Sequence, residues 1–190
     1  MVHPLRRVAV FLLVSVLPLA SCSLSPRTSL VSNPPLPELD LPRFMGRWWV
    51  IANIPYFAER GKVASSDNYT LRDDGGIDVV YAYKSSFDES AERTLRATAW
   101  PLSQSNAHWK QRFFGVFSVQ LQVLEVDPDY RWALIGNPKR SLAWVFAREP
   151  MMSSTAYATV VERLRIHGYD PGDLRRVPQH PDQVGQDGFQ

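Results

Sequence analysis

The chain has few of the residues that build covalent or metal-held scaffolds. It contains one cysteine, Cys22, and four histidines among 190 residues. A single cysteine excludes an internal disulfide, so the stability of the domain has to come from its core. No two histidines stand at the spacing of zinc ligands, and we therefore expect no metal and no cofactor.

An excess of one charge is also missing. Lys and Arg number 21, Asp and Glu number 19, and the two kinds are interleaved along the chain. The chain has no basic stripe of the kind that indicates a nucleic-acid partner. It also has no acidic tail of the kind that indicates a basic partner. Hydrophobic residues at 45 % and aromatic residues at 12 % are enough for a substantial core.

A long apolar run occurs only near the N-terminus. Two arginines precede "VAVFLLVSVLPLA" (residues 8–20), which is short for a transmembrane helix and is interrupted by a proline. This pattern is typical of a signal peptide, which we place at residues 1–21.

The signal peptide ends in "LASC", which resembles the lipobox of bacterial lipoproteins. The resemblance implies cleavage before Cys22 and acylation of its sulfur and its new amine. Ser23 in the next position, rather than aspartate, implies sorting to the outer membrane, so we expect a lipid-anchored protein on its periplasmic face. An ordinary signal peptide with an incidental cysteine is the alternative. Residues 22–41, rich in proline and serine, are expected to form a flexible tether whose last residues pack onto the domain.

Eight short runs of strand-forming residues, separated by turn residues, fill most of the remaining chain. This pattern is typical of an all-β sandwich or barrel with strands in meander order. A hairpin is expected at Asp74 and Gly75. The runs are "WWVIANI", "SSDNYTLR", "IDVVYAY", "RTLRATAW", "HWKQRFF", "FSVQLQVLEV", "RWALIG" and "SLAWVFAR".

The hydrophobic period changes after the last strand. "SSTAYATVVERLRIHG" predicts one amphipathic helix, with Ser153 or Ser154 as N-cap and Gly168 just past its end. The folded domain is therefore expected to span residues 42–178. Residues 179–190 are expected to form a disordered tail.

Alternation along the strands indicates an interior that is not fully packed. Aromatic side chains share the inward face of some strands, whereas "RTLRATAW" offers alanines. Small residues facing aromatic ones leave room, and a barrel of eight strands can hold one small ligand; a fully packed barrel is the alternative. We expect the cavity to be lined by Tyr69, Val79, Tyr81, Ala97, Ala99, Phe113, Leu121, Val123, Trp132, Leu134, Trp144 and Phe146.

Three segments resemble the motifs of the lipocalin family. "GRWW" (46–49) matches the G-x-W motif that opens the fold, and "AWVFAREP" (143–150) matches the third motif, which ends in an arginine. "DPDY" (127–130) resembles the second motif, but Pro128 and Asp129 depart from its usual T-D-Y form, so the resemblance implies no specific contact for these two residues. The similarity is strongest to the bacterial lipocalins and apolipoprotein D, and it runs through almost the whole domain.

The resemblance implies an eight-stranded antiparallel up-and-down barrel with one C-terminal α-helix, closed at one end and open at the other. It also implies a cavity for a fatty acid or a lysophospholipid. The resemblance assigns Gly46, Trp48 and Arg148 to the closed end. There, the family's pattern places Trp48 against the guanidinium of Arg148.

Other functions compete with lipid binding. Some lipocalins are enzymes, but the only cysteine lies outside the barrel and no G-x-S-x-G motif occurs, so we expect no enzyme. A lipoprotein that docks a partner without a ligand is another alternative, and a homodimer stays open.

The sequence leaves the environment of Trp49 undecided. Two environments are open for Glu125. Its side chain either points inward near the closed end, or it is a carboxylate at the strand end that faces solvent.

Overall fold

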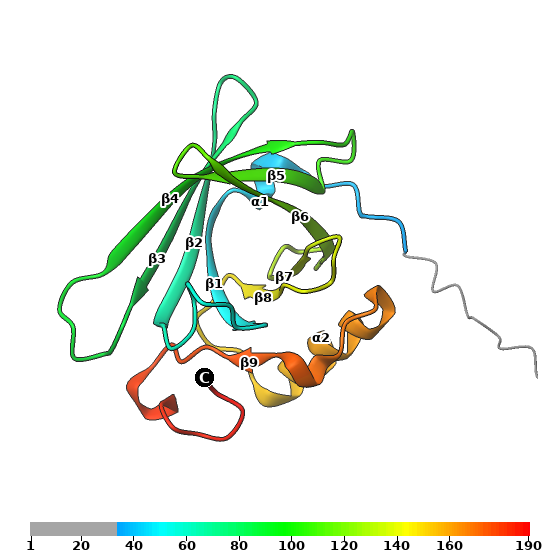
Figure 1. Cartoon of the computed structure of the whole chain (residues 1–190). Coiled ribbons are helices and arrows are strands. Elements are labelled where there is room, and N and C mark those ends of the chain that lie inside the picture. The colour runs from blue at the N-terminus through cyan, green and yellow to red at the C-terminus, as the bar shows by residue number, and fades with distance from the viewer. Residues whose placement is uncertain (1–33) are drawn as a thin grey trace, which may run out of the picture. The chain divides into compact units, whose positions relative to one another are not determined.

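The structure, a computed structural model, describes residues 34–190 and contains a closed antiparallel β-barrel (Figure 1). The strands follow one another round the sheet in chain order, and β1 pairs with both β8 and β2. The barrel strands are β1 (Gly46–Asn53), β2 (Val63–Leu71), β3 (Ile77–Lys84), β4 (Arg93–Pro101), β5 (His108–Phe113), β6 (Phe117–Val126), β7 (Trp132–Gly136) and β8 (Ala143–Ala147). The predicted eight-stranded up-and-down barrel is confirmed. The predicted signal peptide, Cys22 and most of the tether lie outside the described residues.

The remaining elements are not among the eight barrel strands, although Arg175–Arg176 extend the sheet by pairing with Ala52 and Asn53 at the end of β1. They are α1 (Leu41–Phe44), α2 (Ser154–Glu162), β9 (Arg175–Arg176) and 3₁₀ turns at Arg163–His167, Pro171–Asp173 and Pro181–Gln183. No helix among residues 34–190 is long and apolar enough to cross a membrane.

The hairpin between β2 and β3 closes where the sequence predicts. Gly75 has a φ of +79°, in the region that glycine favours, and the Arg72 amide donates to the Gly76 carbonyl at 2.8 Å. The carboxylate of Asp74 accepts a hydrogen bond from the Gly76 amide at 3.0 Å. The turn therefore fixes the register of the two strands.

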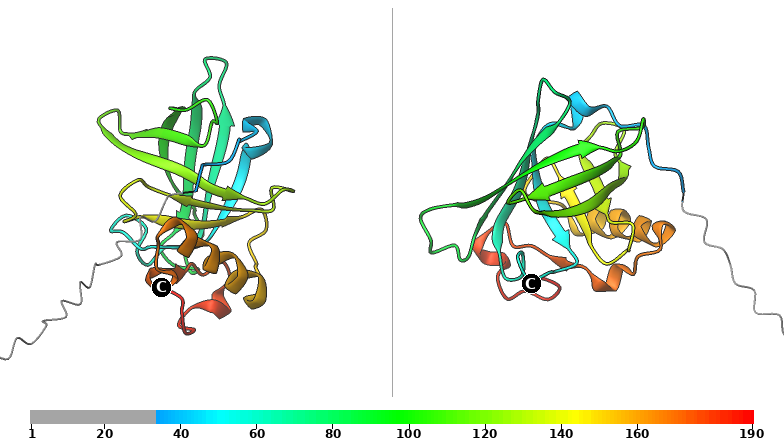
Figure 2. Two further views of the ribbon diagram at one scale, coloured as in Figure 1. Left: turned by 90° about the vertical axis from the view of Figure 1, so that its right-hand side faces the viewer. Right: turned by 45° about the horizontal axis from the view of Figure 1, so that its top comes forward.

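Helix α2 covers the outer face of β7 and β8 (Figure 2). Its N-cap is Ser153, whose hydroxyl accepts a hydrogen bond from the Ala156 amide at 3.2 Å. The helix continues as a 3₁₀ turn that ends at Gly168, whose φ is +79°. Both predicted ends are confirmed. The helix and the strands bury a second apolar cluster that includes Leu134, Val145, Val160, Val161 and Leu164.

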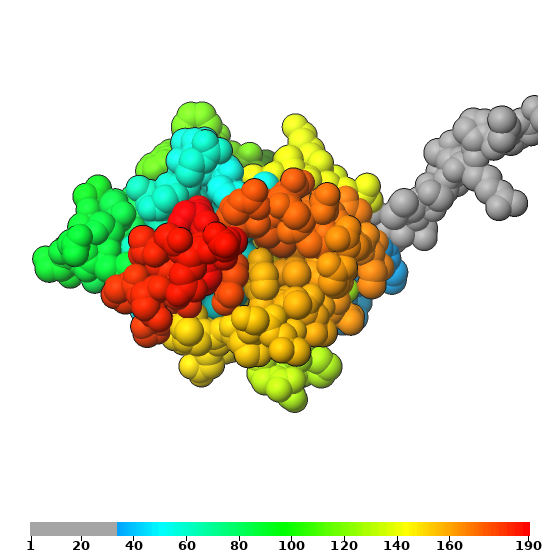
Figure 3. All heavy atoms as spheres, turned by 90° about the horizontal axis from the view of Figure 1, so that it is seen from below, coloured from blue at the N-terminus to red at the C-terminus, as the bar shows by residue number. Residues whose placement is uncertain are grey.

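The last residues are ordered, so the expectation of a disordered tail at residues 179–190 is wrong. The side-chain amide of Gln179 donates to the carbonyls of Val50 at 2.7 Å and Ser65 at 3.2 Å, and so joins β1 to β2. The ring of Phe189 lies 4.5 Å from the guanidinium of Arg176. Figure 3 shows this red C-terminal segment beside the orange helical region. Hydrogen bonds of polar side chains and of the backbone hold this segment in place. Such contacts leave no apolar period in the sequence, so the pattern of residues did not predict that the segment is ordered.

Trp48 forms the floor of the barrel at the closed end. It is fully buried, and its indole nitrogen donates to the carbonyl of Phe44 at 2.7 Å. The ring of Phe44 packs against it with 4.9 Å between centroids, and Phe44 in turn forms a cluster with Tyr69 and Trp109, whose centroids lie 5.4 to 5.6 Å apart. The guanidinium carbon of Arg148 lies 3.8 Å from the centroid of its ring, which confirms the expected stack.

Arg148 also joins the end of β8 to the start of the barrel. Its guanidinium donates to the carbonyls of Arg47 at 2.8 Å and Arg43 at 2.7 Å. Gly46 has a φ of +91°, and a Cβ there would lie 3.5 Å from the guanidinium. The motif glycine therefore provides a backbone conformation that other residues rarely adopt.

Replacing Arg148 with alanine is expected to lower stability without affecting a ligand in the barrel. The loss of the stack and of the hydrogen bonds should cost about 2 kcal/mol. Thermal unfolding should then begin roughly 4–8 °C lower. Arg47→Ala removes an exposed guanidinium from the same end and serves as the control. An equal effect of the two substitutions would contradict this role.

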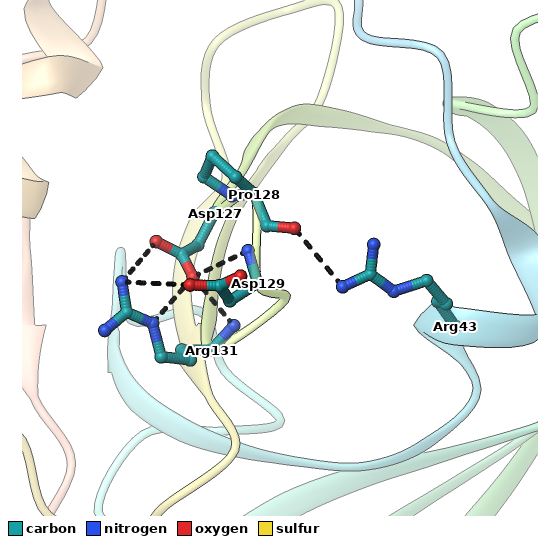
Figure 4. A network of polar contacts seen from close by, with 5 residues as sticks. All are labelled: Arg43, Asp127, Pro128, Asp129 and Arg131. Carbon is teal, nitrogen blue, oxygen red and sulfur yellow. Dashed lines mark hydrogen bonds and ion pairs between the residues drawn. The ribbon is translucent and has the colours of Figure 1, made fainter.

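The turn between β6 and β7 is held by its own charged groups (Figure 4). The buried carboxylate of Asp127 accepts from the amides of Asp129 and Arg131 at 3.1 and 3.2 Å and from the Arg131 guanidinium at 2.9 Å. Hydrogen bonds from Arg131 lower the pKa of Asp127. The guanidinium of Arg43 donates to the Pro128 carbonyl at 3.2 Å, which joins the turn to α1. The "DPDY" segment therefore stabilises the closed end.

The structure settles two points that the sequence leaves open. Trp49 lies on the outer face, half-buried against the helix-covered cluster, with the Arg47 guanidinium 5.3 Å from its ring. Glu125 adopts neither expected environment, because it faces the end of the helical segment. There it contacts Arg163 and lies 2.9 Å from Nε2 of His167.

Candidate functional site

A small cavity lies inside the barrel, toward the end opposite Trp48. We call this end the mouth; it carries the loops at residues 54–62, 85–92, 114–116 and 137–142. The cavity has a volume of about 140 Å³. A space of this size holds one molecule about as large as benzene and is smaller than the ~300–1,000 Å³ of pockets for drug-sized ligands. Part of a lipid fits this volume, and a whole lipid does not.

Ten of the twelve predicted lining residues point into the barrel. Six border the cavity itself: Tyr69, Tyr81, Phe113, Leu121, Trp144 and Phe146. Four lie in the surrounding inner core: Val79, Ala97, Ala99 and Val123. The alternation of side chains therefore identified the inner face on most strands.

Trp132 and Leu134 do not face the cavity, so their predicted positions are wrong. Leu134 is fully buried in the cluster beneath α2, and Trp132 lies beside it with the Arg163 guanidinium 5.9 Å from its ring. Ile135, of the opposite parity, borders the cavity instead. Both faces of β7 are buried, so apolar residues at alternate positions do not show which face is the inner one.

The polar part of the lining is not among the residues predicted from the sequence. Asp67 shares its face of β2 with Tyr69, and Gln111 shares its face of β5 with Phe113, so alternation could have found both. Tyr56 and Glu59 belong to a mouth loop, where no period applies. The other lining residues that were missed are apolar: Leu95, Val119, Ile135 and Leu142.

Glu59 is held inside the mouth by two neutral donors. Its carboxylate oxygen Oε2 accepts hydrogen bonds from Asn53 Nδ2 at 2.6 Å and from Trp144 Nε1 at 2.8 Å. Only 5 % of its surface is exposed. Burial raises the pKa of Glu59 to about 7, although the two hydrogen bonds favour the charged form.

Asp67 is a second acid on the cavity wall, and no lysine or arginine of the described residues lines the cavity beside it. Burial, together with the charge of Glu59, raises the pKa of Asp67 well above its ordinary value. Burial and the same two acids also raise the pKa values of Tyr56 and Tyr81. The hydroxyl of Tyr81 lies 3.2 Å from that of Ser65. One side of the cavity is therefore acidic and the other apolar.

Glu59→Gln is expected to weaken the dependence of stability on pH. The folded-state pKa of about 7 lies above the ordinary value of 4.5, so the folded protein binds more protons between these values. The free energy of unfolding should therefore fall as the pH rises through this window. The free energy of unfolding, measured with urea at pH 5 and pH 8, should fall between these values in both proteins. The fall should be about 2 kcal/mol smaller in the variant than in the unsubstituted protein. Glu92→Gln, at an exposed glutamate, should match the unsubstituted protein, and the same fall in Glu59→Gln would contradict the assignment.

The histidines of the described chain lie away from the cavity. His167 pairs with Glu125 under the helical segment, and Nε2 of His108 lies 3.0 Å from Gln120 on the outside of the sheet. Within residues 34–190, no three His, Cys, Asp or Glu side chains gather as metal ligands would. The cavity is therefore the main candidate for a binding site.

Comparison of sequences places this barrel among known proteins. The family described as "Lipocalin-like domain" matches residues 39–179. Temperature-induced lipocalin-1 of Arabidopsis thaliana is 31 % identical over 151 residues, which cover 74 % of this chain and 80 % of the relative. The outer membrane lipoprotein Blc of Escherichia coli K12 is 30 % identical over 145 residues, covering 75 % and 80 %. Blc of Vibrio cholerae is 27 % identical over 173 residues, covering 90 % and 98 %.

Solved structures agree on the fold. Apocrustacyanin C2 superposes with a TM-score of 0.60 at 11 % identity, covering 75 % of this chain and 81 % of that one. Insecticyanin from the tobacco hornworm Manduca sexta superposes with a TM-score of 0.59 at 17 % identity, covering 75 % and 82 %. With the motifs, the barrel and the sequence matches in agreement, the chain belongs to the lipocalin family and is a lipocalin of the bacterial Blc type.

Proposed function

We propose that the protein is a lipid-binding lipoprotein that takes a fatty acid or a lysophospholipid into its barrel and holds or transfers it. The observation that carries the proposal is the cavity between Trp144, Phe146 and the apolar strands, whose lining is mostly apolar and aromatic. Such a lining with a few polar groups is the usual chemistry of a site for amphiphiles. No reaction is assigned, since the residues that line the cavity include no serine, cysteine or histidine.

The burial of apolar surface would provide the affinity. Each Å² of apolar surface removed from water contributes about 25 cal/mol, so a buried chain segment offers several kcal/mol before ordering costs. The cavity takes only part of a long chain. A longer segment requires the loop at residues 54–62, which closes the space with Tyr56 and Glu59, to move outward.

The mouth is suited to exchange with a membrane. Four large apolar side chains in or beside its loops are 70 to 90 % exposed: Phe57, Phe114, Val116 and Phe117. The described chain also begins at this end, because Pro34 borders the same surface pocket as Asn137 and Pro138 of the β7–β8 loop. The segment between Cys22 and Pro34 spans at most roughly 40 Å. An acyl anchor on Cys22 would thus keep the mouth within reach of the bilayer.

The anchor and the location are part of the same proposal. The relatives in Escherichia coli and Vibrio cholerae are named outer membrane lipoproteins, and this chain has a lipobox-like sequence ending at Cys22. We place the acylated Cys22 in the periplasmic leaflet of the outer membrane. Several acyl chains on one residue give a lasting attachment, because each buried methylene contributes roughly 0.8 kcal/mol.

Native mass spectrometry tests ligand binding. The full chain carrying Cys22→Ser, and therefore free of acyl groups, is titrated with lysophospholipids and fatty acids below their micelle concentrations. A 1:1 complex with a Kd below ~100 µM is expected for at least one of them. If no complex forms at that concentration, the lipid-binding proposal fails.

Cys22→Ser is also expected to abolish acylation of the protein. Cells fed labelled palmitate should incorporate the label into the unsubstituted chain, and the variant should carry none, because no other cysteine exists. Label in the variant would contradict acylation at this residue.

A further inference from the structure

The charged groups of the cavity are suited to a ligand that brings positive charge. Its lining residues, all within the described chain, include Glu59 and Asp67 but no lysine, arginine or histidine. No hydrogen bond or ion pair joins the Asp67 carboxyl to another residue of the range 34–190. An anionic head group entering this space would meet two acids and no cation.

A neutral acceptor on the same wall is also unpaired. Gln111 is 6 % exposed and borders the cavity, and its carbonyl oxygen has no hydrogen-bond partner within the described chain. A buried acceptor left unsatisfied costs about 1–3 kcal/mol. A ligand with N–H or polarised C–H groups would satisfy this oxygen, and a carboxylate, which only accepts, would not.

Aromatic rings complete the surroundings. Tyr56, Tyr69, Tyr81 and Trp144 border the same space as the two acids, and the rings of Tyr56 and Trp144 meet edge to face at 6.4 Å. Aromatic faces attract cations, and clusters of them recognise quaternary ammonium groups in particular. A cavity of about 140 Å³ also matches a compact ammonium group better than a whole acyl chain.

We propose that the cavity selects a single-chain amphiphile whose head carries an ammonium group, held between Glu59, Asp67 and the aromatic rings, and that it discriminates against a free carboxylate. This inference rests on the proposed lipid binding and narrows it, favouring zwitterionic or cationic amphiphiles over fatty acids. The apolar strands opposite the acids accept the first part of the chain.

The head group is tested by three probes with the same twelve-carbon chain: dodecyltrimethylammonium, dodecanoate and dodecanol. The full Cys22→Ser chain is titrated with each below its micelle concentration at pH 8, above the pKa of about 7 that burial gives Glu59. We expect the ammonium probe to bind at least about tenfold more tightly than dodecanoate, with dodecanol in between. Equal or tighter binding of dodecanoate would overturn the inference.

A pair of matched variants assigns the preference to the cavity. Asp67→Asn should weaken the binding of the ammonium probe about tenfold and leave the binding of dodecanol unchanged. Asp78→Asn, at an exposed acid on the outside of β3 that pairs with Arg72, should change neither. An unchanged preference in Asp67→Asn would overturn the role of this acid; should that variant fail to fold, the ranking of the probes still decides.

The outcomes separate the two proposals. Equal binding of all three probes would support a general site for apolar chains and overturn the selection of ammonium. No binding of any probe would contradict the proposed lipid binding as well.

Discussion

Trp48→Ala is expected to destabilise the barrel more than any other single truncation at its closed end. The indole is fully buried, its nitrogen is bonded to the Phe44 carbonyl, and it is stacked under Arg148. Removing a large aromatic side chain from such a core costs about 3–5 kcal/mol. The thermal midpoint should fall by roughly 6–20 °C, as measured by circular dichroism or calorimetry.

The adjacent tryptophan provides a matched control. Trp49 is half-buried on the outer face and lies near the exposed guanidinium of Arg47. Trp49→Ala removes the same side chain from a position one residue away, and we expect it to cost about 1 kcal/mol. Similar losses in the two variants would contradict the assignment of the two indoles to different faces.

Val119→Trp is expected to abolish ligand binding while the protein still folds. Val119 is partly exposed, and it borders the cavity of about 140 Å³, which an indole would largely fill. Affinity for single-chain amphiphiles should fall at least about a hundredfold, as measured by titration calorimetry. Packing strain should cost no more than about 1–3 kcal/mol, so the far-ultraviolet spectrum should be kept.

The same substitution three residues earlier in the chain separates filling from general disturbance. Val116 is 76 % exposed in a mouth loop, so Val116→Trp adds the indole outside the barrel. Binding should stay within about threefold of that of the unsubstituted protein. A folded Val119→Trp variant with unchanged affinity would show that ligands bind elsewhere.

Local patterns predicted the barrel and the helix because each of these elements leaves a period or a cap in the sequence. The hairpin at Gly75 and the cap at Ser153 are made by neighbouring residues and need no knowledge of the fold. The contact of Trp48 with Arg148 joins residues far apart in the chain, and it came from the family motifs rather than from the period.

What the sequence did not predict depends on contacts between distant segments. On β7, the inner face was mistaken because α2 buries the outer face too, and Leu134 lies there. Glu59 reaches the cavity from a loop without a period, and its partner Trp144 is 85 residues away. The ordered tail is held by Gln179, whose amide bonds to two strands leave no signature in composition.

The central claim is that a single-chain amphiphile binds inside the barrel, and anomalous X-ray diffraction from a cocrystal tests it most directly. The ligand is a twelve-carbon alkyltrimethylammonium with a bromine on a carbon close to its head, added at saturating concentration. We predict one bromine peak inside the barrel, among Leu121, Phe113 and Trp144. A well-occupied peak on the outer surface, with the interior of the barrel empty, would contradict the account.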